Sequence, residues 1–213
     1  MNTKNANIVI LLIIVLAFVA GAVLYPQLPA KVASHWGADG QVNGYMGKFW
    51  GTFLVPIIMI GLFLLYVVVP RIDPLKNNIK SFIGYYNAFW IAMFAFLLYI
   101  FALTLAWNIG WQFNFTVAII PAMAVLWFLI GAFLEKLKRN WFIGIRTPWT
   151  LSNDIVWEKT HKLGGKLFKI AGVIAVLGLF VKGPASFLFI IVPVIAFAIT
   201  TFIYSYLIYK KLK

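Results

Sequence analysis

The sequence predicts an all-α polytopic membrane protein, a bundle of six transmembrane helices with both termini in the cytoplasm. Three observations support this prediction: the apolar content, six long apolar stretches and the distribution of basic residues. Apolar residues make up 63% of the 213 residues and charged residues only 11%, whereas soluble domains average about 45–50% and 25%. A soluble globule of this size cannot bury that much apolar surface. The chain also has no cysteine, which excludes a disulfide scaffold and cysteine–metal sites.

Six stretches approach the ~20 apolar residues that cross a hydrocarbon core of ~30 Å. They are residues 8–24, 52–69, 82–106, 115–134, 163–181 and 186–208. Because these spans occupy most of the chain, we expect a single integral membrane domain over residues 1–213. The first span also has features of a cleaved signal peptide, but its apolar core is longer than the about 7–15 residues that are usual there.

The basic residues are distributed unevenly between the two sides of these spans. Fifteen lysines and arginines fall in the N-terminal tail, the second and fourth loops and the C-terminus, where Lys213 is the last of them. Only Lys31, Lys48 and Lys182 fall on the opposite side. The positive-inside rule therefore places both termini in the cytoplasm. The net charge of +13 then reflects topology and an anionic leaflet rather than binding to nucleic acid.

The chemistry of ion-coupled transporters and enzymes is absent from the spans. Their middle parts carry no Asp, Glu, Lys, Arg or His, the groups that transporters place there. His35 and His161 fall on opposite membrane faces, so they cannot share a site. Asp154, Glu158 and His161 share a helical face. We interpret that face as solvated surface with a Glu158–Lys162 pair, since a di-iron site needs more than the chain's two glutamates. We predict no enzyme, no catalytic residue, no cofactor and no metal.

The outer loop, residues 25–51, is long enough to fold. Asp39-Gly40 and Asn43-Gly44 are turn signals, and residues 31–36 suit an extended strand. We expect a small folded cap in which His35-Trp36 lies beside Tyr45 as a polar–aromatic cluster. This cluster either holds the loop together or meets a ligand. The candidate sensing residues are His35, Trp36, Asp39, Tyr45 and Lys48.

The inner loop, residues 135–166, contains the second candidate site. Pro148 and Ser152/Asn153 predict a turn followed by a helix N-cap. The following helix, residues 154–163, carries basic residues and a partial apolar stripe, so we expect it to lie on the inner leaflet. The planar guanidinium of Arg146 has five N–H donors, which could bind a lipid phosphate, bind a partner carboxylate or cap the carbonyls of a neighbouring helix. The candidate partner-binding or structural residues are Asn140, Gly144, Arg146, Thr147, Pro148, Trp157 and His161.

Three prolines leave an alternative function open. Pro56, Pro121 and Pro193 each lie in the outer part of an outside-to-inside span. Kinks at one depth could open the bundle as a cavity for a permease or lipid-handling protein, although such prolines are also common packing kinks. An intramembrane enzyme is a further, weaker alternative.

The two loops together resemble those of one protein family. The outer loop resembles a short module found near the N-terminus of many bacterial membrane proteins, here Pro29, His35-Trp36, Gly40, Tyr45 and Lys48. The inner loop resembles the signature of the SdpI family, here Asn140, residues 144–148, Trp157 and His161. This resemblance implies a plasma-membrane immunity protein that protects a bacterium from a membrane-active toxic peptide. The best-known kind of this family also holds a small winged-helix repressor at the membrane when the toxin is present, so the resemblance makes such a repressor a candidate partner here. We expect no direct contact with nucleic acid.

Overall fold

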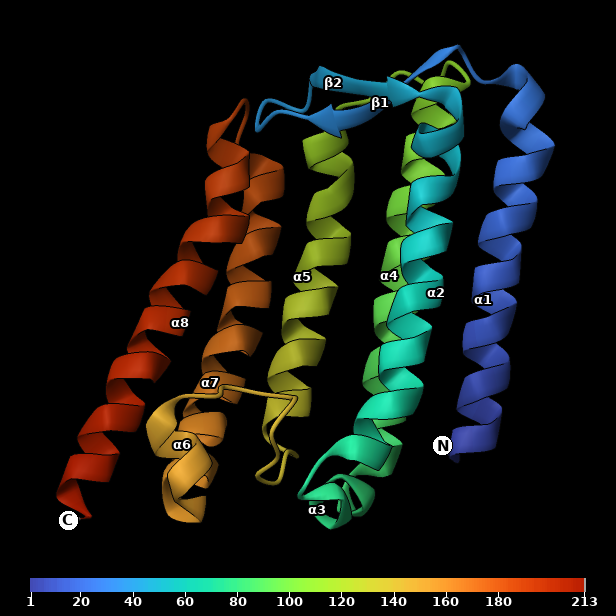
Figure 1. Cartoon of the computed structure of the whole chain (residues 1–213). Helices are drawn as coiled ribbons and strands as arrows, with labels where there is room; N and C mark the ends of the chain where they lie inside the picture. The colour runs from blue at the N-terminus through green and yellow to red at the C-terminus, as the bar shows by residue number, and fades with distance from the viewer. Residues whose placement is uncertain (213) are drawn as a thin grey trace.

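The computed structural model describes residues 1–212 as a bundle of long helices that is capped at one end by a β-hairpin (Figure 1). The elements are α1 (Thr3–Leu24), a short 3-10 turn (Tyr25–Gln27), β1 (Lys31–Trp36), β2 (Val42–Gly47), α2 (Lys48–Ile72), α3 (Lys76–Ser81), α4 (Ile83–Asn108), α5 (Phe115–Leu134), α6 (Pro148–Ser152), α7 (Asp154–Leu177), a second 3-10 turn (Gly178–Phe180) and α8 (Ala185–Lys211). Six helices, α1, α2, α4, α5, α7 and α8, are long and apolar enough to cross a membrane. The predicted all-α polytopic fold is therefore confirmed, while Lys213 lies outside the described residues.

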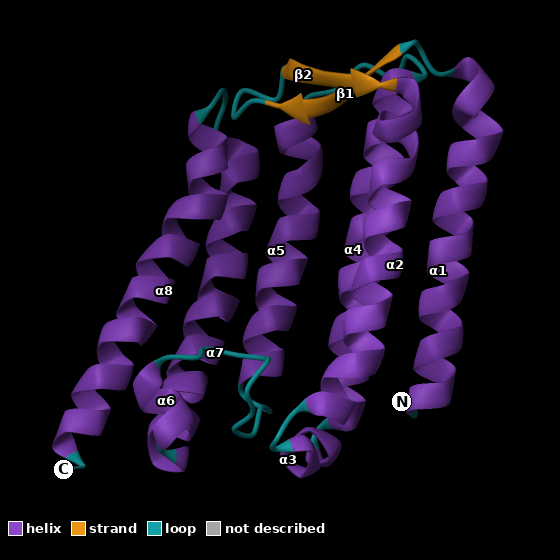
Figure 2. Ribbon diagram, viewed as in Figure 1, coloured by secondary structure: helices purple, strands orange, loops and turns teal. Residues whose placement is uncertain are grey.

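The six helices form two groups. Helices α1, α2 and α4 pack together, α5, α7 and α8 pack together, and contacts between α4 and α5 join the groups (Figure 2). The hairpin lies across one end of the bundle, and α3, α6, the start of α1 and the end of α8 lie at the other (Figure 1). The two long loops and the two termini thus have the relative arrangement expected for an even number of spans. Which end faces the cytoplasm stays a prediction.

Helices α5 and α7 approach each other closely because glycines face the contact. A Cβ atom built on Gly172 would lie 2.6 Å from the Ala124 carbonyl oxygen, and one on Gly131 would lie 2.5 Å from the Gly165 carbonyl oxygen. Any side chain there would separate the backbones. Without a hydrophobic driving force in lipid, such close van der Waals packing is what associates membrane helices. This pair forms the framework of the second helix group.

Polar side chains on α2 and α4 join helices of the first group. Tyr66 on α2 donates to Asn87 Oδ1 on α4 at 3.0 Å, and Asn87 Nδ2 donates to the Met1 carbonyl at 3.2 Å. The Tyr86 hydroxyl donates to the Tyr66 carbonyl at 2.8 Å. All three side chains are buried. This network fixes α1, α2 and α4 against one another at the end of the bundle away from the hairpin.

The segment expected to lie on the inner leaflet is instead the beginning of a spanning helix. Helix α7 runs from Asp154 to Leu177 without a break, so the expectation of a separate surface helix at residues 154–163 is wrong. The reason is that Gly165, which follows that segment, is a contact with α5 rather than a helix end. The predicted N-cap is confirmed, since Asn153 Oδ1 accepts from the N–H groups of Ile155 and Val156 at 2.8 and 3.1 Å.

Candidate functional site

The outer loop folds as an antiparallel hairpin. Strand β1 pairs with β2, with Lys31 opposite Gly47 and Trp36 opposite Val42, and irregularities near His35 shift the register. The predicted turn at Asp39-Gly40 is confirmed: Gly40 has a φ of +78°, which favours glycine. Asp39 Oδ1 accepts from the Gln41 N–H at 3.0 Å, so this carboxylate closes the turn. The hairpin is a folded cap, as the sequence predicts.

Asparagine and threonine side chains fasten the hairpin to α4 and α5. At the end of α4, Asn108 Oδ1 accepts from the Ala33 N–H at 2.7 Å and Asn108 Nδ2 donates to the Ala33 carbonyl at 3.0 Å. Asn114 donates to the Asp39 carbonyl at 2.8 Å, and Thr116 donates to the Gly37 carbonyl at 3.2 Å. These bonds go to backbone atoms of the hairpin, so they fix its position on α4 and α5 without using its side chains.

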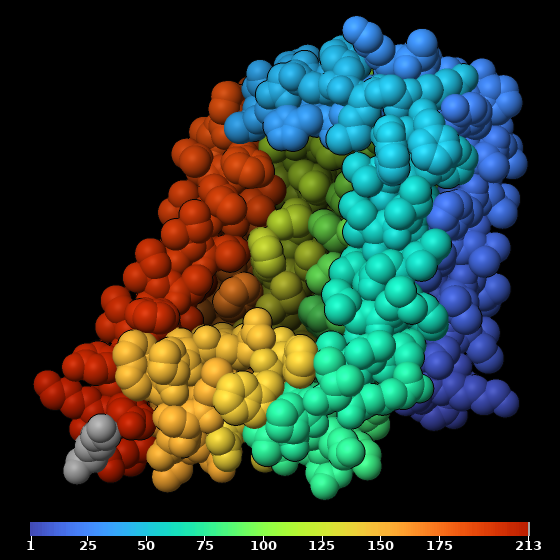
Figure 3. Space-filling model, viewed as in Figure 1, coloured from blue at the N-terminus to red at the C-terminus, as the bar shows by residue number. Residues whose placement is uncertain are grey.

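Beneath this cap lies a cavity of about 540 Å³. It is lined from the hairpin and from α2, α4, α5 and α8, by residues that include Ser34, Trp36, Leu54, Thr104, Ile119 and Phe187. Figure 3 shows the hollow between α2 and α8, with the hairpin above, α4 and α5 behind, and the inner loop below. The cavity is the part nearest the hairpin of a groove that opens sideways between α2 and α8. This whole groove is called the lateral groove below.

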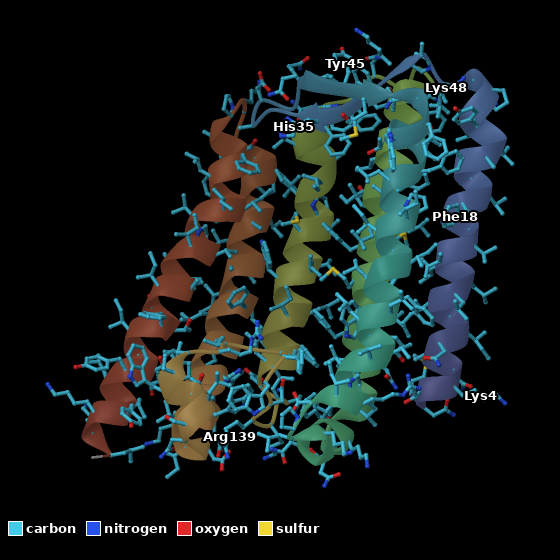
Figure 4. The ribbon with its side chains drawn as sticks, viewed as in Figure 1. Lys4, Phe18, His35, Tyr45, Lys48 and Arg139 are labelled. Atoms are coloured by element: carbon cyan, nitrogen blue, oxygen red, sulfur yellow. The ribbon has the colours of Figure 1, made fainter. Side chains whose placement is uncertain are left out.

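The predicted outer residues have separate positions around this cavity. The Trp36 ring stacks on Phe115 with centroids 3.9 Å apart, and its buried Nε1 has no hydrogen-bond partner among residues 1–212. His35 is exposed and donates from Nδ1 to Asn43 Oδ1 at 2.5 Å. Tyr45 lies opposite Ala33 and is 60% exposed. The ring partners of Trp36 among the described residues are Trp107 and Phe115 rather than Tyr45, so the predicted cluster with Tyr45 does not form. Figure 4 shows His35 and Tyr45 on the hairpin.

Lys48 also lies away from the cavity lining. Its Nζ atom is 4.8 Å from the centre of the Tyr25 ring, a cation–π contact between the start of α2 and the 3-10 turn that follows α1. Of the five predicted outer residues, His35 and Trp36 line the cavity, and Asp39, Tyr45 and Lys48 do not.

Around the inner loop, the buried Asn140 side chain forms four hydrogen bonds. Its Oδ1 accepts from the N–H groups of Phe142 and Ile143, at 3.0 and 2.7 Å, and its Nδ2 donates to the Lys138 and Ile143 carbonyls, both at 3.0 Å. These bonds saturate the amide. Asn140 therefore acts as the structural centre of a tight loop rather than as a group available to a partner.

The buried imidazole of His161 joins α7 to this loop. His161 Nδ1 donates to the Trp157 carbonyl at 2.8 Å, which leaves Nε2 to accept from the Ile145 N–H at 2.9 Å. The His161 ring stacks on the Trp157 ring with centroids 4.0 Å apart, and Trp157 Nε1 donates to the Leu137 carbonyl at 3.0 Å. The predicted inner residues Gly144, Trp157 and His161 are thus brought together by packing.

The next segment attaches the loop to α8. Thr147 caps α6, whose first residue is Pro148, and its Oγ1 lies 3.0 Å from Ser205 Oγ on α8. The Trp149 ring contacts the Phe202 ring at 5.3 Å. This attachment forms the lower boundary of the lateral groove in Figure 3.

Arg146 and Asp154 have only local partners. Arg146 is exposed and donates to the Trp141 carbonyl at 2.9 Å, within its own loop. Asp154 pairs with Arg139 at 2.6 Å. The predicted Glu158–Lys162 ion pair does not form among the described residues, where the ion pairs are Arg139–Asp154 and Lys169–Glu135.

Three residues that position these loops were not singled out in the sequence. Asp73 is buried between α2 and α3, and its carboxylate accepts from the N–H groups of Leu75 at 2.6 Å and Trp141 at 2.9 Å. Asn108 and Asn114 fasten the hairpin. Each of these three residues lies at the boundary of an apolar span. An Asp or Asn at such a boundary, as in Asp73-Pro74, is a turn signal. No sequence pattern indicates their distant partners.

Comparisons with known proteins agree with this architecture. Residues 136–205, from the end of α5 to α8, match the SdpI/YfhL protein family. Residues 12–60, from α1 through the hairpin into α2, match a domain of unknown function (DUF1648). The chain is 28% identical over 208 residues to Immunity protein SdpI of Bacillus subtilis (strain 168), which covers 97% of each chain. No solved structure matches it.

The matched regions contain the two loops described above, each with helices that flank it in the sequence. The first contains the hairpin, and the second contains the Asn140–His161 arrangement and its attachment to α8. The chain has six helices that can span a membrane, and its similarity to the bacterial protein covers 97% of both chains. It is therefore a multi-pass bacterial membrane protein. The chain is thus similar to the SdpI/YfhL protein family over residues 136–205 and to Immunity protein SdpI along nearly its whole length.

Proposed function

We propose that this protein protects the bacterium that carries it from a membrane-active toxic peptide, which it captures in the lateral groove beneath the hairpin. Similarity to an immunity protein along 97% of the chain supports a membrane immunity-type function. The single observation that carries the proposed mode of action is the groove itself. It opens sideways between α2 and α8, toward the bilayer in which a membrane-active peptide resides.

The lining of the groove suits an apolar peptide segment. Leu54, Ile119 and Phe187 present aliphatic and aromatic surface from three helices, while Ser34 and Thr104 add hydroxyl groups. A mostly apolar site with a few polar groups is typical of ligand pockets of this size. Trp36 adds a buried donor without a partner at the roof. An unpaired buried donor costs about 1–3 kcal/mol, and a ligand carbonyl would relieve that cost.

The alternative of a permease is less well supported. A permease needs a path between the two membrane faces. Here the outer end of the groove lies under a hairpin fastened through Asn108, Asn114 and Thr116. The other end lies over the inner loop, which Thr147 attaches to α8. A groove that is bounded at both ends and open at its side favours capture from the bilayer over passage across it.

We propose further that the inner loop reports toxin binding to a cytosolic winged-helix repressor. Exposed Arg146 supplies a planar set of donors with one local bond. Toxin binding can change the inner loop only if one arrangement of the bundle binds the toxin better than another. Helix α8 bounds the groove with Phe187 and contacts the inner loop through Ser205, so it is the element that connects the two sites.

Toxin survival of matched variants tests the capture model. Cells lacking the gene are exposed to spent medium of the parent strain, with protease-treated medium as the control for a peptide toxin. Leu54→Trp fills the cavity from α2, whereas Leu64→Trp places the same ring on a lipid-exposed position of the same helix. We expect Leu64→Trp to restore survival and Leu54→Trp to fail at equal membrane levels. Equal survival of the two variants would exclude the groove as the toxin site.

A further inference from the structure

A second pocket, of about 680 Å³, lies at the inner end of the bundle among α3, the end of α5 and the start of α7. Five basic and three acidic side chains line it: Lys136, Lys138, Arg139, Lys162 and Lys166, and Glu135, Asp154 and Glu158. Two of the acids already have partners. Asp154 pairs with Arg139 at 2.6 Å, and Glu135 pairs with Lys169 at 2.8 Å. The pocket therefore has an excess of positive charge.

Four exposed lysines of the lining, Lys136, Lys138, Lys162 and Lys166, form no ion pair among the described residues and outnumber Glu158, the lining acid that also has none. The ammonium groups of Lys138, Lys162 and Lys166 form no ion pair or hydrogen bond with any of residues 1–212. Lys162 and Lys166 are one turn apart on α7, so they lie on the same helix face. Basic pockets at this depth, between transmembrane helices on the cytoplasmic side, suit anionic lipid headgroups.

An apolar furrow between α4 and α5 begins where this charged pocket ends. It consists of two adjoining clefts of about 200 and 520 Å³, which share Ala92 and Leu129. The smaller cleft shares Lys136 with the charged pocket. Small side chains keep the furrow open along both helices: Ala88, Ala92, Ala95, Ala122 and Ala132.

The furrow has the dimensions of an acyl chain. From Tyr85 to Phe96 on α4, a helix advances about 16 Å at 1.5 Å per residue, close to half of the ~30 Å hydrocarbon core. At its charged end, Lys136 Nζ lies 5.6 Å from the centre of the half-exposed Tyr85 ring. A lysine beside a tyrosine is typical of the interface between headgroups and acyl chains.

We propose that the charged pocket and the furrow together bind one anionic phospholipid of the inner leaflet. The phosphate lies among Lys138, Lys162 and Lys166, and an acyl chain lies in the furrow past Ala92. This lipid occupies the face formed by α4 and α5, whereas the lateral groove opens between α2 and α8. The site is independent of the proposed toxin site and does not rest on the proposed function.

Lipid titration of the purified protein tests the proposal. The protein in mild detergent is titrated with phosphatidylglycerol or phosphatidylcholine, and bound lipid is counted by native mass spectrometry. We expect one phosphatidylglycerol to bind in preference to phosphatidylcholine. Since each lysine near such a headgroup contributes about 1 kcal/mol, the double variant Lys162→Gln/Lys166→Gln should weaken binding about 30-fold. The control Lys210→Gln/Lys211→Gln removes the same charge from the end of α8 and should leave binding unchanged.

A furrow variant distinguishes a lipid from a soluble anion. Ala92→Phe blocks the point shared by the two clefts, and Ala196→Phe places the same ring on an exposed position of α8. Only Ala92→Phe should weaken phosphatidylglycerol binding. If inorganic phosphate competes fully and Ala92→Phe has no effect, the pocket binds a soluble anion and the lipid proposal is wrong. Equal binding of both lipids, or equal loss in the two lysine variants, would also overturn it.

Discussion

His161 Nε2 accepts a hydrogen bond from the backbone N–H of Ile145 at 2.9 Å, and this bond fixes the inner loop to α7. This bond explains why the inner-loop residues that resemble the SdpI signature lie together in space. Gly144 has a φ of +113°, and a Cβ atom there would collide with His161 Nε2. The glycine and the histidine are therefore two halves of one contact. The inner candidate residues are coupled by packing before any partner binds.

Substituting Gly144 should destabilise the protein through this contact. Gly144→Ala adds backbone strain and a collision with a buried imidazole, so we expect a loss of about 2–4 kcal/mol. Gly110→Ala is the matched control because Gly110 has a φ of +107° and nothing within 4 Å of an added Cβ. It should lose only about 1–2 kcal/mol from strain. Thermal unfolding in detergent compares the two, and equal losses would show that the His161 contact is unimportant.

Loss of the Asn108 side chain should release the hairpin from the bundle. Asn108→Ala removes both hydrogen bonds to the Ala33 backbone, each worth about 1 kcal/mol net. We expect faster hydrogen exchange in residues 31–36 and unchanged exchange in residues 140–153. Asn108→Asp keeps the acceptor for the Ala33 N–H and should have an intermediate effect. Protection of β1 equal to that of the unsubstituted protein would contradict this anchoring role.

The membrane orientation can be tested with single cysteines, because the natural chain has none. Tyr45 on the hairpin is 60% exposed and Trp141 in the inner loop is 50% exposed. A membrane-impermeant maleimide should label Tyr45→Cys in intact cells and Trp141→Cys only after lysis. This outcome follows from the fifteen basic residues on the side of the inner loop. The reverse labelling pattern would place the termini outside.

Protection and signalling should be separable by substitution. Arg146→Ala removes one bond within an exposed loop, so it should leave membrane level and survival within about 2-fold of normal and abolish the transcriptional response to spent medium. Trp36→Ala removes the stacking on Phe115 in the groove and should reduce survival first. The measurements are protein level, survival and genome-wide transcription on the same strains.

Arg139→Ala is the control for a purely structural arginine. Arg139 bonds both Asp154 and the Leu151 carbonyl, so its loss should lower protein level, survival and transcription together. If Arg146→Ala behaves in the same way, Arg146 is structural and the separable-loop hypothesis fails.

The sequence determined the features that depend on local composition and spacing. Six apolar stretches of spanning length predict six helices. In hydrocarbon every backbone N–H and C=O group needs a hydrogen-bond partner, and a helix is the structure that pairs them all within one segment. Asp39-Gly40 predicts the turn of the hairpin, and Asn153 before an apolar run predicts the N-cap of α7. Each of these signals acts over a few residues, so the sequence is sufficient to identify it.

The tertiary structure decided which helices are neighbours and which polar groups meet. Lipid-facing and protein-facing positions are almost equally apolar in a membrane helix, so hydropathy does not indicate the lateral groove between α2 and α8. Gly165 could have ended a surface helix, but its contact with α5 makes it part of a span. Asn108 reaches Ala33 across 75 positions, and Asp73 reaches Trp141 across 68. Such partners are selected only when packing brings distant backbone groups out of water together, and each buried group must then be satisfied.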